Sequence, residues 1–480
     1  MNALSRNLAI ESPRLSPRPV PASAYLIAFA GALLFVLLTA QAFFRAGLAG
    51  WSVGLAYILY DSALLAFTGR KIGALTRPQP TPMATVDPPP TLGAIIAAHN
   101  EAGVLKVTID HLLAQDQPPE TILIADDGST DETAAVLESL YRLAPPPVGV
   151  MSDPAPGEPR LRWLRLPHGG KARALNQAML WLDTDLVMTI DADTLVDPGA
   201  LGAMRAAFAG DPHLVAATGV LTPICGPSLK GRFFEWFQRY EYVRNFLSRY
   251  AWGRVNSLLL VSGAFGAYRR EALLAVGGFD PLCLVEDYEL THRLHRHSAD
   301  RGLGWRVAVV GEATARTDAP ASLIGFLKQR RRWFGGYLQT QFWNRDMIGN
   351  PHFGALGRAH MPVKTLDTLQ PIYGITAFGV LVTLLVTGRL FVASAVLAVM
   401  LAKVALDLGY HLWSIHLYRR WTGKHEGLGL GAAMLASLLE PFTFQLLRHI
   451  GALWGWHAFL TGRETWGWQQ RTAIGVEAGR

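Results

Sequence analysis

Residues 121–132 read TILIADDGSTDE: an apolar run of strand length ends on two aspartates, and the next residues form a capping box from Ser129 to Glu132, which predicts a helix start. Three more runs of strand length lie nearby: LGAIIAA (92–98), RLRWLRL (160–166) and LVMTIDAD (186–193). Helical patterns follow the first two, from Ala102 and near 170–182. This alternation predicts an α/β fold with a mostly parallel sheet and helices on both faces.

Apolar segments of membrane-spanning length flank this region, which lacks comparable segments of its own. Residues 25–44 and 51–67 precede it, and about 20 apolar residues suffice to cross a hydrocarbon core of ~30 Å. Further spans are expected near 368–388, 390–412 and 428–447, with a short re-entrant or interfacial helix at 450–460. A cleaved signal peptide is the alternative for the first segment. Its apolar stretch is long for that role, and a second one follows at once.

Basic residues border the spans on the side of the soluble region: Arg6, Arg14, Arg18, Arg70, Lys71, Arg77, Arg419, Arg420 and Lys424. By the positive-inside rule they place that region in the cytoplasm. The net charge of +7, from 44 Lys and Arg against 37 Asp and Glu, suits an anionic inner leaflet. The chain has two cysteines, Cys225 and Cys283, so no disulfide framework is implied.

A proline-rich linker, PQPTPMATVDPPP (78–90), separates the second span from the soluble region. We therefore divide the chain into three parts: an N-terminal tail with two transmembrane helices (1–77), a cytoplasmic domain with interfacial helices (91–345) and a C-terminal transmembrane region (346–480).

Two acidic motifs end predicted strands: Asp126-Asp127, and Asp191 with Asp193 as Asp-Ala-Asp. An Asp-Asp-Gly-Ser sequence is also a common turn and helix cap, so the first motif by itself has an ordinary structural explanation. Alternate carboxylates beyond a strand end, however, can hold a hard divalent cation together with substrate phosphates. The two motifs together favour a functional site at one edge of the sheet.

Two further segments carry candidate chemistry. HGGKARALN (168–176) places Lys171 and free backbone N–H groups at a helix start, where they would either meet a phosphate or simply begin the helix. LVEDYELTHRL (284–294) places Glu286, Asp287 and Glu289 ahead of a polar helix. These carboxylates are either a solvated acidic turn or include a general base for a sugar hydroxyl.

In order along residues 92–336, the chain contains AAHNE, ADDGST, GGKARALN, DAD, SGAFGAYRREAL with GGFD, VEDYELTHRL and QRRRW. This ordered set resembles the inverting family 2 glycosyltransferases, and within them the membrane-embedded cellulose, hyaluronan and poly-N-acetylglucosamine synthases. The resemblance implies a GT-A domain inserted between transmembrane helices, about two before and three after. It also implies a multi-pass protein of the bacterial inner (plasma) membrane.

The resemblance assigns roles by position. The nucleotide-sugar site would comprise Glu101, Asp126, Asp127, Lys171, Asp191, Gln329 and Arg332. Asp193, helped by Asp191, would bind Mg²⁺ or Mn²⁺, and Asp287 would be the catalytic base. The acceptor site would comprise Ser262, Gly263, Phe265 and Trp333. His99 departs from the pattern, because many relatives carry Tyr or Arg at its position.

Three arginines in QRRRWFGG (329–336) call for separate explanations. Arg332 would meet the departing diphosphate bidentately, beside Gln329, and Trp333 would offer a flat apolar face to the acceptor sugar. Arg330 and Arg331 are expected to be exposed positive-inside charges on an interfacial helix. Nucleic acid is not an expected partner, because no aromatic-interleaved basic surface accompanies the cluster.

The sequence thus predicts a processive, inverting β-glycosyltransferase that extends a polysaccharide from UDP-Glc or UDP-GlcNAc and passes it through its own helices. Lys403, Asp407, His411 and Glu440, inside apolar segments, would face the bundle interior or an aqueous path, although Lys403 and Asp407 also have the spacing of an intrahelical pair. The expected partners are the donor, a polysaccharide or glycolipid acceptor and membrane lipid, with room for an accessory export subunit. The alternatives are transfer of one sugar to a lipid, and a transporter or sensor that binds the nucleotide sugar without turnover.

Overall fold

An eight-stranded mixed sheet forms the centre of the soluble region. The computed structural model describes residues 3–45, 47–77, 89–424 and 429–462. Within these ranges the strands are β1 (Leu92–Ala98), β2 (Thr121–Asp127), β3 (Leu161–Leu166), β4 (Leu186–Asp191), β5 (Thr194–Val196), β6 (Leu214–Ile224), β7 (Phe265–Arg269) and β8 (Arg306–Asp318). Their spatial order is β3-β2-β1-β4-β7-β6-β8-β5.

The first four strands of that order are parallel and bring the acidic motifs to one edge. Ala98 of β1 pairs with Asp126 of β2, and Ala97 pairs with Asp191 of β4. β1 is apolar throughout, as a strand covered on both faces must be. Beyond β4 the sheet changes character, because β7 runs antiparallel to both β4 and β6.

Helices cover both faces of the sheet, and the neighbouring side chains of Ile95 and Ile96 accordingly pack into different apolar clusters. One cluster includes residues of α4 (Leu105–Leu113), α5 (Thr133–Tyr141), α7 (Ala200–Gly210), α8 (Leu229–Gly253) and α11 (Leu323–Trp343). The other includes residues of α6 (Lys171–Ala178), α9 (Arg270–Ala275) and α10 (Glu286–Arg301). The predicted two-faced α/β architecture is confirmed.

The predicted capping box is wrong in detail. Helix α5 begins at Thr133, whose backbone N–H donates to the carboxylate of Asp131 at 3.0 Å. The hydroxyl of Ser129 instead accepts the backbone N–H of Asn100 at 3.0 Å, across the turn that follows β1. Ser129 therefore joins two loops at the edge of the sheet, which only the folded chain brings together.

Apolar helices lie at both ends of the chain: α2 (Ala22–Phe44), α3 (Ser52–Ile72), α12 (Met361–Asp367), α13 (Gln370–Val386), α14 (Leu390–Thr422), α15 (Leu430–Leu439) and α16 (Phe444–Leu460). Among the described residues, three helices are long and apolar enough to cross a membrane, or up to five if each of two bent pairs is one span. The predicted span at 428–447 breaks near Thr443, with a bend of 46°, and its second half continues through the separately predicted 450–460 piece.

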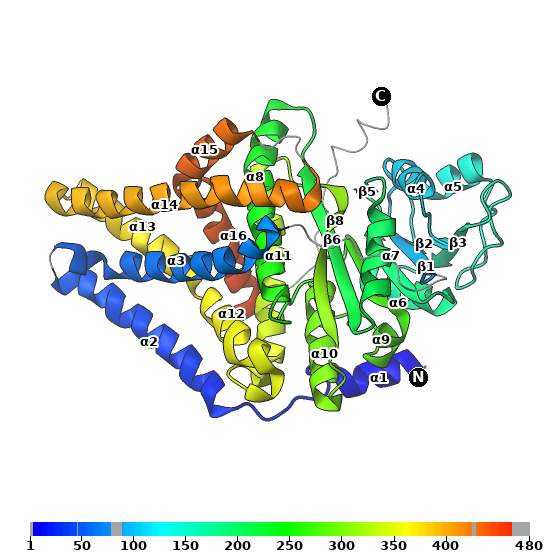
Figure 1. The fold of residues 1–480 in the computed structure, drawn as a ribbon, viewed down its shortest axis with the longest axis horizontal. Coiled ribbons are helices and arrows are strands. Elements are labelled where there is room, and N and C mark those ends of the chain that lie inside the picture. The colour runs from blue at the N-terminus through cyan, green and yellow to red at the C-terminus, as the bar shows by residue number, and fades with distance from the viewer. Residues whose placement is uncertain (1–2, 46, 78–88, 425–428, 463–480) are drawn as a thin grey trace.

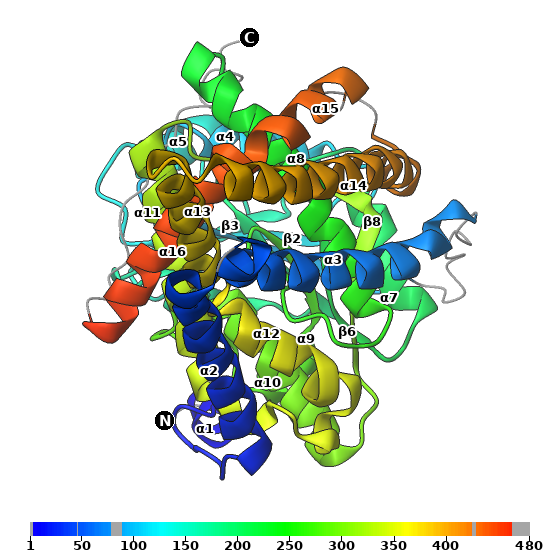
Figure 2. The ribbon, with the colours of Figure 1, turned by 90° about the vertical axis from the view of Figure 1, so that its left-hand side faces the viewer.

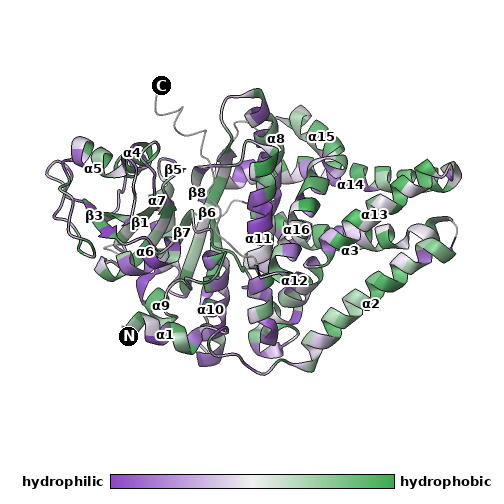
Figure 3. Cartoon of the chain, turned by 180° about the vertical axis from the view of Figure 1, so that it is seen from behind, coloured by the Kyte–Doolittle hydropathy of each residue, from purple (hydrophilic) through white to green (hydrophobic). Residues whose placement is uncertain are grey.

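The apolar helices project from one side of the molecule and the sheet domain forms the other (Figure 1). Figure 2, viewed from the side of the apolar helices, shows α3, α13 and α14 in front of the sheet. In Figure 1, α8 and α11 run across the direction of α3 and α14, and α14 crosses α8 and reaches β8. Figure 3 shows that α10 and α11 are markedly more hydrophilic than α2, α3 and α13. This arrangement suits helices α8 and α11 at a membrane interface.

Glycines allow α11 and α16 to pack closely. A Cβ at Gly451 of α16 would lie 2.6 Å from the Cβ of Arg330, and one at Gly455 would lie 2.9 Å from the carbonyl oxygen of Arg331. On α11, a Cβ at Gly336 would lie 2.7 Å from Cγ2 of Val285, two residues before Asp287. The glycine pair that ends QRRRWFGG therefore lets α11 approach the segment that carries the predicted base.

We expect Gly451→Ala to lower stability by about 1–3 kcal/mol, because the added methyl group would collide with the Cβ of Arg330. The matched control is Gly379→Ala in α13, where a Cβ meets nothing within 4 Å. The measurement is the thermal unfolding midpoint in detergent. Equal midpoints for the two variants would contradict the proposed tight contact.

Candidate active site

The carboxylate of Asp126 is held at the end of β2 by two donors. Its Oδ1 accepts the backbone N–H of Ser129 at 2.9 Å, and its Oδ2 accepts the indole N–H of Trp163 at 3.3 Å. Nearby, Glu101 is buried and its backbone N–H donates to the Thr133 hydroxyl at 3.0 Å. Asp126 and Glu101 thus both lie where the ends of β1 and β2 meet, and the contact of their carboxylates with a nucleotide stays a prediction.

Asp127 shapes the glycine-rich loop. Its two carboxylate oxygens accept the backbone N–H groups of Gly169 and Gly170, each at 2.8 Å. Only 3% of Asp127 is exposed. The sequence assigned this aspartate to the nucleotide, but in the structure its first role is to fix the loop that leads to Lys171.

Two histidines stack beside Asp127. The rings of His99 and His168 lie 4.3 Å apart between centroids, and Nδ1 of His168 is 2.9 Å from Oδ2 of Asp127. Potential ligand atoms of these three residues all lie within 4.8 Å of one another. This mixed nitrogen and oxygen set suits borderline cations such as Zn²⁺ better than Mg²⁺. His99, which departs from the family pattern, therefore lies in a cluster of two histidines and an aspartate.

Lys171 connects the Asp-Ala-Asp motif to the segment of the predicted base. Its ammonium forms an ion pair with Asp191 and lies 3.7 Å from Oε1 of Glu286. Burial alone would lower the pKa of Lys171, but the charges of Asp191 and Glu286 outweigh it and raise the pKa. The lysine therefore remains a cation in the middle of the acidic cluster.

Oxygen donors at the end of β4 fit a hard divalent cation. Asp191 is partly exposed and Asp193, one residue farther, is 8% exposed. The backbone carbonyl of Asp193 accepts the N–H of Asp318 at 3.3 Å, which ties the motif to β8. Carboxylate oxygens of this kind are what Mg²⁺ and Mn²⁺ prefer, so this donor set fits the predicted metal better than the histidine pair does.

Among the three carboxylates of the 284–294 segment, the geometry singles out Asp287. Glu289 is fully buried and pairs with Arg293 at 2.7 Å, which gives it a structural role. Glu286 is 5% exposed, and burial raises its pKa. Asp287 is partly exposed at the start of α10, and its Oδ2 accepts the backbone N–H of Gly263 at 2.8 Å.

Gly263 belongs to the predicted acceptor segment, and Ser262 is beside it, with its N–H 3.3 Å from the Thr218 hydroxyl. The prediction that Phe265 contacts the acceptor is wrong. Its side chain is 0% exposed and its ring packs against Gly219 of β6, so it belongs to the core rather than to the acceptor site.

Comparison with known proteins identifies the family. Residues 88–336 match the family described as glycosyltransferase like family 2, which is more than half of the chain. The chain belongs to this family. The predicted membership is confirmed.

The family 2 chain is similar to the poly-beta-1,6-N-acetyl-D-glucosamine synthases of two staphylococci. It is 28% identical over 290 residues to that of Staphylococcus aureus (strain MSSA476), covering 60% of this chain and 61% of the relative. It is 27% identical over 263 residues to that of Staphylococcus epidermidis, covering 52% and 56%. The matches thus span less than two thirds of each relative.

A solved structure shares the fold. The mannosyltransferase PcManGT from Pyrobaculum calidifontis, in complex with GDP-Man and Mn²⁺, superposes with a TM-score of 0.56 at 20% identity. The match covers 82% of this chain and 99% of that one. At this identity the likeness shows the fold alone, and it confirms the predicted GT-A class.

In this family 2 enzyme, the QRRRW motif forms part of α11, and the outcome for its arginines differs from the prediction. Arg330 is buried, pairs with Glu241 of α8 at 2.8 Å and lies over the ring of Trp333 at 4.5 Å. The prediction of an exposed charge is wrong for Arg330. Arg331 is partly exposed, over the Trp454 ring of α16 at 4.9 Å.

Gln329 and Arg332 lie on the same helix. Gln329 is 8% exposed, and its Oε1 has no hydrogen-bond partner among the described residues. An unpaired buried amide oxygen is unfavourable, so a ligand donor there would stabilise it. Burial raises the pKa of Glu286, and the charges of Lys171 and Arg332 partly oppose this shift.

Arg249 of α8 was not among the predicted site residues. Its guanidinium lies over the Phe246 ring at 4.6 Å, and its Nη1 is buried with no partner among the described residues. Burial lowers its pKa to about 10, with Tyr242 and Asp287 acting in the opposite direction. In the sequence, the helical spacing of Tyr242, Phe246 and Arg249 already indicates that these three side chains share one face of a helix.

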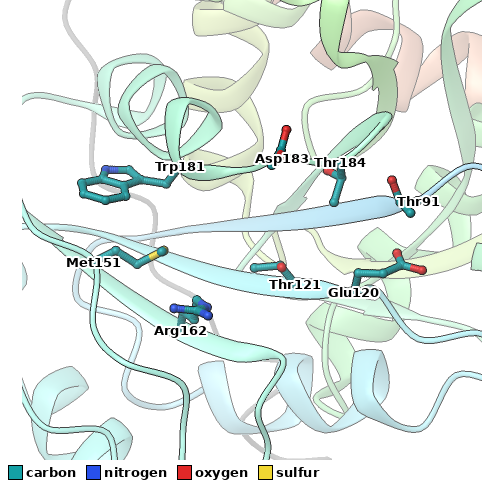
Figure 4. Close-up of a pocket in the computed structure, with 8 residues that line it drawn as sticks. All are labelled: Thr91, Glu120, Thr121, Met151, Arg162, Trp181, Asp183 and Thr184. Atoms are coloured by element: carbon teal, nitrogen blue, oxygen red, sulfur yellow. The ribbon is translucent and has the colours of Figure 1, made fainter.

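A surface cavity of about 360 Å³ lies elsewhere, at the amino ends of β1 and β2 (Figure 4). Thr91, Thr121 and Thr184, which line it, precede or begin strands of the parallel sheet. Because ligands of such sheets bind at the carboxyl ends, this cavity is not the catalytic site.

Arg330→Gln should be much more harmful than Arg331→Gln, although each removes one charge from the same motif. Loss of Arg330 leaves Glu241 buried with a weakened set of partners, at a cost of about 3 kcal/mol. Loss of Arg331 removes an accessible cation–π contact worth about 0.5–1 kcal/mol. Thermal unfolding and nucleotide release would be measured for both. Equal losses would show that the buried pair is not a stabilising contact.

Proposed function

We propose that the chain is an inverting, processive β-glycosyltransferase that extends a polysaccharide from UDP-Glc or UDP-GlcNAc. One observation carries this proposal. At Gly263, a Cβ would lie 3.2 Å from Nζ of Lys171 and 3.4 Å from Oδ2 of Asp287. A carboxylate suited to deprotonate an acceptor and a cation suited to a diphosphate therefore meet at one backbone position, beside the acceptor segment.

In the proposed reaction, Asp287 accepts the proton of an acceptor hydroxyl as that oxygen bonds to the anomeric carbon. The bond between this carbon and the diphosphate oxygen breaks, and its electron pair leaves with the nucleotide diphosphate. Attack from the face opposite the diphosphate inverts the configuration. Lys171 and Arg332 stabilise the charge that develops on the leaving oxygens.

Asp191 and Asp193 would hold Mg²⁺ or Mn²⁺ beside these cations. When bound, the metal supplies positive charge for the diphosphate. The oxygen-only donor set and its place at the end of β4 support this assignment. Lys171 pairs with Asp191, so the lysine and a bound metal would both neutralise this carboxylate.

A cavity of about 110 Å³ among the apolar helices supports passage of the product through the membrane. Tyr57, Asp61, Lys403, Asp407, Gln445 and His449 contribute polar groups to its lining. Lys403 pairs with Asp407 within α14 and also with Asp61 of α3, at 2.7 Å. The alternative of an intrahelical pair is thus present, and the same lysine faces the bundle interior. Polar groups in this position are typical of a functional path.

The proposal also includes the orientation of the chain in the membrane. We place the sheet domain in the cytoplasm and the spans in the bacterial inner membrane. The basic flanks support this orientation.

Asp287→Asn should abolish turnover while leaving nucleotide binding intact, because the amide keeps the shape of the side chain but cannot accept the proton. Glu289→Gln is the structural comparison, and it should reduce folded protein rather than specifically affect the chemical step. UDP affinity and UDP release would be measured on purified protein. An active Asp287→Asn with an inactive but folded Glu286→Gln would move the base to Glu286.

Incubation of the purified enzyme with a panel of radiolabelled nucleotide sugars tests the whole proposal. With Mg²⁺ or Mn²⁺ we expect one UDP-sugar to yield long polymer, and chelator to stop the reaction. Products with a single added sugar would favour transfer to a lipid acceptor. Binding of the nucleotide sugar without UDP release for any donor would favour the transporter or sensor.

A further inference from the structure

The N-terminal segment packs on the sheet domain instead of extending along the membrane. Helix α1 (Ala3–Glu11) and the residues up to Arg18, which we call the N-terminal clasp, precede α2. The side chain of Leu4 is 6% exposed and packs in the cluster formed by α6, α9 and α10. The backbone of Leu8 lies directly on Gly277, which has φ +86°, so any side chain at Gly277 would collide with it.

One part of the clasp holds the GGFD loop (277–280). Arg14 donates to both carboxylate oxygens of Asp280, from Nε and Nη2, each at 3.0 Å. Asp280 is 0% exposed, and the Ser12 hydroxyl lies 3.4 Å from its Oδ2. A bidentate pair with a fully buried carboxylate is among the stronger ionic contacts in proteins.

The other part holds the last turns of α10. Oε1 of Glu11 accepts a hydrogen bond from the Arg301 guanidinium at 2.8 Å and lies 3.2 Å from Nδ1 of His297. Burial would raise the pKa of Glu11, but His297 and Arg301 outweigh it and lower the pKa. Arg18 donates to both oxygens of Asp300, at 3.0 and 2.6 Å.

The GGFD loop in turn contacts both helices that begin at the active site. Arg293 of α10 donates to the carbonyl oxygens of Val276 and Gly278, each at 2.6 Å. Asn176 of α6 donates to the carbonyl of Phe279 at 2.7 Å and accepts its N–H at 2.8 Å. Helix α10 begins with Glu286 and Asp287, and α6 begins with Lys171.

We propose that Arg14 and Glu11 are positioning residues for catalysis, which hold α10 so that Asp287 faces the acceptor. The clasp reaches α10 at its last turns and, through Asp280 and the GGFD loop, at Arg293 in its middle. It also joins α10 to α2, which begins at Ala22, four residues after Arg18. The sequence identified Arg14 and Arg18 only as positive-inside charges, and in the structure carboxylates of the sheet domain bind both. The proposal rests on the proposed function only in taking Asp287 as the base.

The test compares Arg14→Gln with Arg6→Gln. Both remove one positive charge from the same segment, but Arg6 is exposed and forms no ion pair with the described residues. For Arg14→Gln we expect kcat to fall about tenfold, with the KM for the nucleotide sugar within about twofold, because misplacement of a base affects the chemical step. Arg14→Lys should retain intermediate activity. Arg6→Gln should match the wild type.

Hydrogen exchange of the amides of residues 285–290 is measured on the same proteins. Exchange should be faster in Arg14→Gln and unchanged in Arg6→Gln, and this readout does not depend on which carboxylate is the base. The double variant Arg14→Gln, Asp280→Asn should be no worse than the more severe of the two single variants.

Three outcomes would overturn the proposal: equal loss of kcat in Arg6→Gln, an activity loss in Arg14→Gln that only follows the loss of folded protein, or unchanged exchange at the start of α10. Changed exchange together with an active Asp287→Asn would instead support the clasp and overturn the assignment of the base.

Discussion

A buried set of ion pairs joins the QRRRW motif to the apolar helices. Arg330 of α11 pairs with Glu241 of α8, and Arg448 of α16 pairs with Glu440 at 2.6 Å and lies 3.9 Å from Glu241. Buried charges of this kind need one another, because removal of one leaves an uncompensated charge in a medium of low dielectric constant. Helix α11 therefore has one favourable position relative to α16, and glycines at the contact let the two backbones reach it.

This constraint explains how α11 can hold predicted site residues in fixed positions. Trp333 lies against Arg330, so the predicted acceptor face is supported by the same ion pairs that anchor the helix. Gly336 brings α11 against Val285, two residues before Asp287. The proposed donor residues at the end of the sheet, the proposed base on α10 and the predicted acceptor residue Trp333 on α11 thus come from elements that share closely packed contacts.

Several elements were predictable because their signals are local. Apolar runs that end in aspartates predict parallel strands with a polar edge, and the register confirms that edge. Errors arose where partners are distant in sequence. Phe265 belongs to a strand core that forms only when β7 pairs with β6, and Arg330 finds Glu241, 89 residues away, only after α8 and α11 pack together. The sequence alone does not show that Arg14 forms an ion pair rather than facing lipid, because its partner Asp280 lies 266 residues farther along the chain.

The sequence by itself determined the family, the α/β class, the apolar segments and the residue types of the site, since motif order and hydrophobic periodicity are properties of neighbouring residues. Only the tertiary structure decided which of those residues are accessible. In the fold, Glu289 forms an ion pair with Arg293, and Asp127 accepts a backbone N–H of the glycine loop. Asp287 remains partly exposed and accepts the backbone N–H of Gly263. The reason is physical: the availability of a carboxylate depends on which donors the fold brings within hydrogen-bonding distance, and most of those donors come from other elements.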